Sequence, residues 1–207
     1  MKPIVVAVTG ASGAVYARRL IEVLLAQRRP VQFLISPTGA QVWEHELEHP
    51  IGLDPFDPTT LQLAVDPRNL DCLEYYANDD YFSPVASGGA ESDGMVIVPC
   101  SGDTLSAVAH GAASNLIRRA AEVQLKERRK LILVPRETPL SLVAIDNMKR
   151  ATEAGAVVLP ASPGWYNNVR SLDDLVDFVV ARIMTQLGLP QRLVPNWGDN
   201  ARVVYDP

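Results

Sequence analysis

Two short apolar runs, separated by a helical segment, most strongly constrain how this chain folds. Residues 94–99 read Gly-Met-Val-Ile-Val-Pro, residues 131–135 read Leu-Ile-Leu-Val-Pro, and polar residues follow each run. The segment between them is typical of one helix that ends near Lys126. We therefore predict a β-α-β unit with two buried parallel strands. The turns after both strands then meet at the carboxyl edge of the sheet, where α/β proteins bind ligands.

The remaining pattern extends this unit to a whole domain. Strands are predicted at residues 4–8, 31–35 and 156–160, and helices at about 140–154 and at 172–187. This order predicts an α/β fold with three layers, Rossmann-like or flavodoxin-like, doubly wound on a mainly parallel sheet. We expect residues 1–207 to form a single domain, with an irregular excursion at about 50–92 and a carboxyl-terminal arm at about 188–207 that carries Trp197.

Composition excludes several classes of protein. A net charge of -5 and a pI near 5.2 argue against a nucleic-acid-binding protein and against a basic membrane-surface protein. No apolar run is long enough to span a bilayer, and the amino terminus enters a strand without a signal-peptide pattern, so we expect the cytoplasm. Cys72 and Cys100 do not suggest a disulfide framework or a thiolate metal site.

A glycine turn follows the first predicted strand. Gly10, Ser12 and Gly13 would let backbone amides and a hydroxyl approach an anion at the start of the next helix, although a tight turn without a ligand needs similar residues. The chain has no G-x-G-x-x-G and no acidic residue at the end of the second strand. The hydroxyl of Ser36 at that point favours a mononucleotide such as FMN over NAD.

Residues 45–49 read His-Glu-Leu-Glu-His and match the zinc motif H-E-x-x-H. Pro50 and Gly52 follow at once, so we favour a solvated helix end and expect no metal. Glu46 remains a candidate acid/base close to the ligand edge.

Charged and aromatic side chains supply the other candidates. Arg119, Glu122 and Lys126 share one helix face, and Lys126 is the better candidate for binding a phosphate or a carboxylate. Residues 128–130, Arg-Arg-Lys, are predicted to be the solvated end of that helix. Tyr81 and Phe82 form either an aromatic wall or part of the core. Together with Arg136, Glu137 and the loop of residues 164–166, these residues predict a site for a planar, phosphate-bearing ligand.

Several motifs resemble those of one enzyme family, in the same order and over nearly the whole chain. They are Thr9-Gly-Ala-Ser-Gly-Ala14, Pro99-Cys-Ser101 with Thr104, Asn115-Leu116 with Arg119-Ala120, Leu125-Lys-Glu-Arg-Arg129, Val134-Pro-Arg-Glu-Thr-Pro139, Asn147-Met148 and Trp165-Tyr166. The family is that of the flavin prenyltransferases, the UbiX family.

The resemblance implies a reaction. Members join the dimethylallyl group of dimethylallyl monophosphate to N5 and C6 of reduced FMN without a metal, and the prenylated FMN serves a separate UbiD-type decarboxylase. It also implies homododecamers with sites at subunit boundaries, so that Tyr166 and Arg182 would complete a neighbour's pocket.

The resemblance assigns roles to individual residues. FMN contacts are expected from Gly10, Ala11, Ser12, Ser36, Ser101, Gly102, Asp103, Thr104 and Arg136. Tyr81, Arg119, Lys126, Tyr166 and Arg182 would bind the prenyl donor, and Ser12, Glu46, Lys126 and Glu137 would be catalytic. Tyr81 stands where many members have Trp, and its ring stabilises a cation more weakly, so either the rate or the prenyl-donor preference is expected to differ.

A second function stays open from the sequence. A flavin-dependent decarboxylase of the phosphopantothenoylcysteine type would share the fold. Its catalytic histidine is not evident among His45, His49 and His110.

Overall fold

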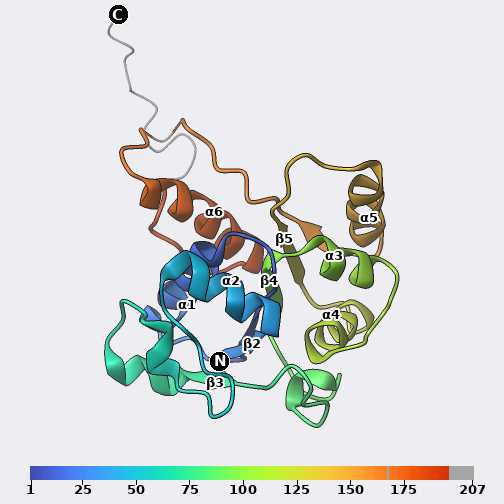
Figure 1. Ribbon diagram of the computed structural model, residues 1–207, viewed down its shortest axis with the longest axis horizontal. Helices are drawn as coiled ribbons and strands as arrows, with labels where there is room; N and C mark the ends of the chain where they lie inside the picture. The colour runs from blue at the N-terminus through green and yellow to red at the C-terminus, as the bar shows by residue number, and fades with distance from the viewer. Residues whose placement is uncertain (167, 196–207) are drawn as a thin grey trace, which may run out of the picture.

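Apolar, β-rich runs form the middle of a six-stranded parallel sheet in the computed structural model, which describes residues 1–166 and 168–195 (Figure 1). Strands β1 (Ile4–Val8), β4 (Gly94–Cys100) and β5 (Leu131–Pro135) are buried along their whole length. Such complete burial is expected where helices cover both faces of a parallel sheet. Strand β2 (Val31–Ile35) lies beside β1, and the short strands β3 (Leu73–Tyr75) and β6 (Val157–Val158) form the two edges.

The strand order is β3-β2-β1-β4-β5-β6. The chain first winds outward from β1 and then, from β4, winds outward in the opposite direction. The switch point therefore lies between β1 and β4, where doubly wound proteins place their ligand crevice. The predicted three-layer, doubly wound α/β fold is confirmed, with a sheet that is parallel throughout.

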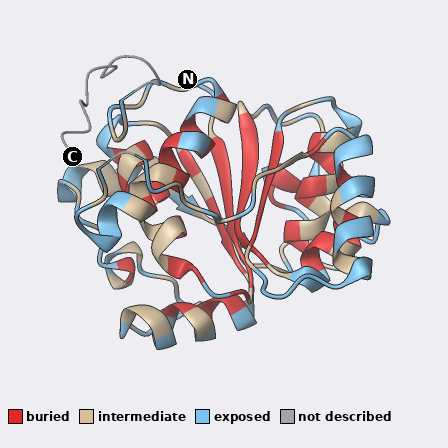
Figure 2. Cartoon of the chain, turned by 90° about the horizontal axis from the view of Figure 1, so that it is seen from above, coloured by how far each residue is buried: buried red, intermediate tan, exposed pale blue. Residues whose placement is uncertain are grey.

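Helices pack on both faces of the sheet (Figure 2). Alternate residues of β1 point to opposite faces. Ile4 and Val6 join a core with α1 (Ala14–Ala26) and α6 (Leu172–Leu187). Val5 and Ala7 join a second core with α3 (Gly102–Ala109), α4 (Leu116–Lys126) and α5 (Leu142–Glu153). Because α4 and α6 lie on opposite faces, the sheet separates their side chains.

The segment between β4 and β5 forms two helices, where the sequence predicted one. Helix α3 ends before His110, and Gly111 adopts a φ of +67° that favours glycine. Helix α4 begins after Asn115, whose side chain accepts a hydrogen bond from the Arg118 amide at 3.0 Å. A C-terminal glycine and an N-terminal cap thus divide the segment.

The excursion at 50–92 contains a strand that the sequence analysis did not predict. β3 pairs parallel to β2, with Tyr75 opposite Phe33, and Phe56 stacks on Tyr75 with ring centroids 4.2 Å apart. Three residues are too few to show the alternation by which strands are recognised. The rest of the excursion holds three 3₁₀ helices, at Pro58–Leu61, Pro67–Cys72 and Pro84–Ala86.

The remaining boundaries differ by a few residues. Helix α2 spans Pro37–Leu47, α5 begins at Leu142 behind its cap Ser141, and β6 is shorter than the predicted run at 156–160. Of the expected arm at 188–207, residues 196–207 with Trp197 lie outside the described residues. Within the described ranges, no helix is long and apolar enough to cross a membrane.

The burial of the Leu24 side chain in helix α1 predicts that shortening it destabilises the protein strongly. Leu24 is fully buried, whereas Leu172 at the start of α6 is 80% exposed. We expect Leu24→Ala to lower the free energy of unfolding by about 2–5 kcal/mol, because it removes buried methyl groups and leaves a cavity. Leu172→Ala is the matched control and should change it by less than about 0.5 kcal/mol in the same urea titration. Equal effects of the two variants would contradict this packing.

Candidate active site

Thr9 connects the ends of β1 and β4 at the switch point. Its buried hydroxyl donates to the Pro99 carbonyl at 2.8 Å and accepts from the Ser101 amide at 2.8 Å. The Thr9 amide also donates to Pro99 at 3.2 Å. These bonds fix the glycine turn relative to the start of α3. Sequence reasoning did not assign Thr9 a role of its own, although a hydroxyl residue directly after a buried strand was the available signal.

The glycine turn is tightly enclosed. A Cβ at Gly10 would lie 2.5 Å from Cγ2 of Thr38, and Gly13 has a φ of +121°. Both positions therefore favour glycine. Ser12 is exposed between them, and its carbonyl accepts a hydrogen bond from Nε of Arg136 at 3.2 Å.

Glu46 lies at the amino end of α1. Its Oε2 accepts hydrogen bonds from the amides of Gly13 at 2.9 Å and Ala14 at 2.8 Å. These amides have no partner within the helix, and the helix dipole favours a negative charge there. The carboxylate thus reaches from α2 to the turn that presents Ser12, which places Glu46 at the ligand edge.

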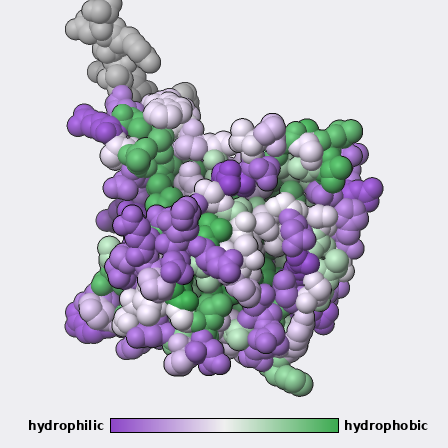
Figure 3. All heavy atoms as spheres, in the orientation of Figure 1, coloured by the Kyte–Doolittle hydropathy of each residue, from purple (hydrophilic) through white to green (hydrophobic). Residues whose placement is uncertain are grey.

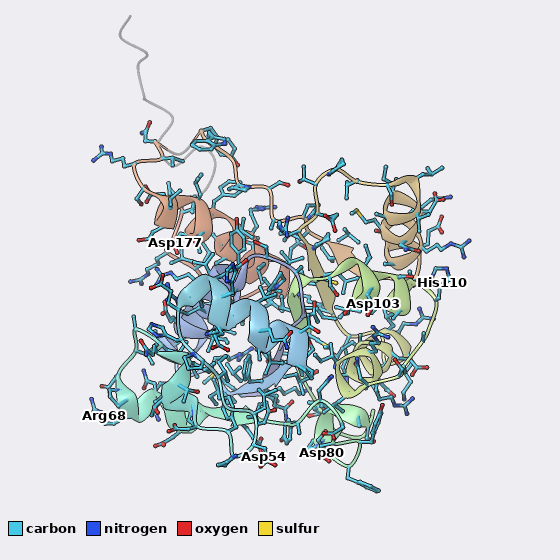
Figure 4. All side chains as sticks on the ribbon, viewed as in Figure 1. Asp54, Arg68, Asp80, Asp103, His110 and Asp177 are labelled. Atoms are coloured by element: carbon cyan, nitrogen blue, oxygen red, sulfur yellow. The ribbon has the colours of Figure 1, made fainter. Side chains whose placement is uncertain are left out.

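The first turn of α3 lies at the same edge, next to the glycine turn. Oγ of Ser101 accepts from the Thr104 amide at 3.2 Å and lies 3.0 Å from the Thr104 hydroxyl. Gly102 and Asp103 are exposed, and Asp103 forms an ion pair with Arg118 of α4 (Figure 4). Ser36 caps α2 by accepting from the Gly39 amide at 3.0 Å.

Arg136 and Glu137 follow β5 at this edge. Arg136 is half-buried against the Ser12 turn, whereas Glu137 is exposed and accepts from the Thr138 amide at 3.1 Å. The carboxyl edge of one chain therefore carries the predicted residues Gly10, Ala11, Ser12, Ser36, Glu46, Ser101, Gly102, Asp103, Thr104, Arg136 and Glu137.

Lys126 lies at the other end of the sheet. It ends α4 just before β5 begins, and the Lys130 carbonyl accepts from the Met95 amide at 2.8 Å, at the start of β4. Lys126 pairs with Glu127 at 2.6 Å. Five strand residues at about 3.3 Å each separate this edge from the other. One chain therefore does not bring Lys126 to Ser12.

The other predicted substrate-binding residues are dispersed too. Arg119 pairs with Glu122 at 2.9 Å on α4, and Tyr81 is 47% exposed in the loop that reaches the start of that helix. The ring of Tyr166 packs edge to face on Phe178 of α6 at 5.6 Å, and Arg182 is exposed on the same helix. Because α4 and α6 lie on opposite faces, one chain presents these side chains in separate places.

The histidines do not form a metal site of the kind that H-E-x-x-H describes. Helix α2 ends at Leu47 and Glu48 has a φ of +59°, so His49 lies beyond the helix that carries His45. His110 lies at the end of α3, where Nδ1 is 2.8 Å from the Ser106 carbonyl (Figure 4). Across residues 1–166 and 168–195, no three His, Cys, Asp or Glu side chains are grouped to hold a metal ion.

Cys100 ends β4 beside the switch point but is fully buried. Burial raises the pKa of its thiol to about 12. The thiol therefore stays protonated at neutral pH and does not act as a nucleophile.

Comparisons with known proteins show the family to which this chain belongs. The profile of the family described as Flavoprotein matches residues 1–184. A flavin prenyltransferase UbiX from Pseudomonas aeruginosa is 46% identical over 199 residues, which cover 95% of this chain and 94% of the relative. This chain belongs to the UbiX flavin prenyltransferase family.

Two solved structures of UbiX-type proteins have the same fold. AnUbiX, in complex with FMN and dimethylallyl pyrophosphate, aligns with a TM-score of 0.81 and 34% identity, covering 95% of this chain and 97% of that one. A dodecameric FMN-dependent UbiX-like decarboxylase from Escherichia coli O157:H7 aligns with a TM-score of 0.80 and 31% identity, covering 94% and 98%.

The contacts of Glu46 predict the effect of removing its charge. In Glu46→Gln, the negative charge that the start of α1 favours is lost and only one oxygen remains to accept from the amides of Gly13 and Ala14, so we expect the turn to loosen and FMN to bind about tenfold more weakly. Glu44→Gln, an exposed position on the same helix, is the control. Flavin fluorescence titration measures both, and unchanged affinity in Glu46→Gln would contradict the inferred support of the turn.

Proposed function

We propose that this chain is a flavin prenyltransferase that joins the dimethylallyl group of dimethylallyl monophosphate to N5 and C6 of reduced FMN. The observation that carries the proposal is the match over nearly the full length to a flavin prenyltransferase, 46% identical. The flavin is the nucleophile, and inorganic phosphate is the leaving group. N5 and C6 each lose one proton as their bonds to carbon form; one proton adds to the donor's double bond so that the ring can close, and the other leaves with the phosphate. No metal is needed in this chemistry.

The carboxyl edge of the sheet is the proposed flavin side. The exposed amides at the start of α3 and the Gly10–Gly13 turn suit an anionic phosphate and a close backbone approach. Arg136 holds the Ser12 carbonyl and supplies positive charge next to the turn. These residues would bind and orient FMN, together with the hydroxyls of Ser36 and Ser101.

The proposed phosphate side consists of Arg119 and Lys126 on α4 together with Tyr166 and Arg182, which lie at α6 on the opposite face of the sheet in one chain. Breaking an allylic C–O bond moves negative charge to the phosphate, and preorganised cations and hydroxyls stabilise that charge as it develops. Tyr81 and Tyr166 would offer aromatic faces to the allylic cation. Lys126 pairs with Glu127 in this structure, and its ammonium group has further N–H donors for the phosphate.

Carboxylates are proposed to move the proton. Glu137 is exposed at the carboxyl edge of the sheet, the proposed flavin edge, beside Arg136 and is the better placed base. Both Glu46 oxygens face backbone amides, so we propose that Glu46 mainly keeps Ser12 in place.

Assembly is the proposed means of uniting the two sides. In one chain Ser12 and Lys126 lie at opposite edges of the sheet, so we propose that a homo-oligomer, a dodecamer as in the E. coli neighbour, forms sites between subunits. Exposed apolar side chains support such contacts: Figure 3 shows them over α5, where Leu140, Leu142, Val143 and Ile145 are 44–73% exposed.

A UbiD-type decarboxylase is the proposed recipient of the prenylated FMN, because that product serves as a cofactor and not as an end product. The cytoplasm is the proposed location, and the free thiols Cys72 and Cys100 agree with a reducing compartment.

A decarboxylase of the phosphopantothenoylcysteine type is the alternative. It would need a histidine at the flavin edge, but His110 lies at the far end of α3 and His45 is exposed on α2. The positions of these histidines favour prenyl transfer.

Mass spectrometry of the flavin tests the proposed function. The protein is incubated anaerobically with reduced FMN and dimethylallyl monophosphate, and the extracted flavin is expected to be heavier by one C5H8 unit. Glu137→Gln should slow product formation by at least about tenfold if its carboxylate takes the proton. Unmodified FMN, with both substrates intact and the flavin bound, would overturn prenyl transfer and favour the decarboxylase.

A further inference from the structure

Arg129, just after α4, fastens a glycine-containing loop to that helix. Its Nη1 donates to the Ala90 carbonyl at 2.6 Å and its Nη2 donates to the Gly88 carbonyl at 2.7 Å. The planar guanidinium suits this double contact, because two of its N–H groups point in fixed directions. The sequence-based prediction that residues 128–130 are a solvated helix end is therefore wrong for Arg129, which is half-buried, whereas Arg128 is exposed.

The same loop touches both cations of α4 that are candidates for binding the prenyl phosphate. Nε of Arg119 donates to the Ala86 carbonyl at 3.2 Å. A Cβ at Gly88 would come within 2.8 Å of Nζ of Lys126 and would overlap the carboxylate of Glu127. The Lys126–Glu127 pair thus lies directly over the backbone of Gly88. The loop of residues 86–90 consequently runs along α4 from Arg119 to Lys126.

The loop of residues 86–90 has no acidic side chain of its own with which to pair the arginines of α4 and Arg129. The stretch from Ser83 to Ser92 has one acidic residue, Glu91, and this residue pairs with Lys2 at 3.1 Å. The loop therefore meets Arg119 and Arg129 with carbonyl dipoles and not with carboxylates. Gly88 and Gly89 give its backbone more freedom than other residues would. Besides turn hydrogen bonds of its own, the loop is held by the contacts from Arg119 and Arg129.

We propose that Arg129 is a positioning residue for the prenyl donor: it fixes loop 86–90 on α4, and the loop keeps Arg119 and Lys126 arranged for the donor's phosphate. This proposal rests on the proposed function. Arg129 itself donates to the carbonyls of Gly88 and Ala90, so its proposed role is exerted through the loop. Its loss would leave the flavin edge intact, because Ser12, Arg136 and the start of α3 lie at the other end of the sheet.

Two substitutions at Arg129 separate geometry from charge. Arg129→Lys keeps the positive charge but loses the planar pair of donors, and Arg129→Gln loses both. We expect both variants to raise the KM for dimethylallyl monophosphate about tenfold or more, with the FMN dissociation constant within about twofold of wild type. Arg128→Lys, the exposed neighbour, is the control and should match wild type.

Hydrogen exchange of the backbone amides gives a readout that does not need turnover. Amides of residues 86–90 should exchange faster in both Arg129 variants than in Arg128→Lys, while those of α3 stay unchanged. Arg129→Lys with a wild-type KM and wild-type exchange would overturn the proposal, as would a lower melting temperature with an unchanged KM. A wild-type protein that makes no prenylated flavin would instead overturn the proposed function itself.

Discussion

The direction of the parallel strands decides which candidate functional side chains of this protein meet. Residues that follow strands gather at the carboxyl edge, where the Thr9 hydroxyl ties β1 to β4 and thereby sets the glycine turn beside α3. Residues at the carboxyl end of α4 gather at the opposite edge, where the strands begin, because this helix returns the chain to the start of β5. The flavin-side residues and Lys126 are therefore separated by the length of a strand.

Each side is organised by backbone hydrogen bonds to charged side chains. At the carboxyl edge, Glu46 accepts from two amides at the start of α1, and Arg136 donates to the Ser12 carbonyl. At α4, Arg129 and Arg119 donate to three carbonyls of one loop. In both places the charged group holds a glycine-containing turn, whose own conformational preference is weak. Side chains that resemble acid/base or phosphate ligands by sequence thus also serve to shape the backbone.

Much of the fold could be predicted from the sequence, since β1, β2, β4 and β5 are short apolar runs closed by polar residues and α6 shows a regular amphipathic period. Strand β3 was not predicted because three residues, two half-buried and one exposed, are too few to show a period. The break between α3 and α4 was not predicted because it depends on one glycine and one helix cap. The glycine turn and Arg136 could be assigned to the carboxyl edge because position after a strand fixes the edge. The contacts of Arg129 could not be predicted, since the local sequence is the same whether the arginine is solvated at a helix end or donates hydrogen bonds to a distant loop.

We propose that a complete site needs more than one copy of this chain. Mixing two inactive variants, Ser12→Ala and Lys126→Ala, after joint dissociation and reassembly tests it most directly. If sites are shared between subunits, some sites in the mixed oligomer contain only intact residues, and flavin prenylation returns to a fraction of the wild-type rate. If the mixture stays as inactive as either variant alone, while wild-type protein carried through the same procedure recovers its activity, each chain builds its own site and sites are not shared between subunits.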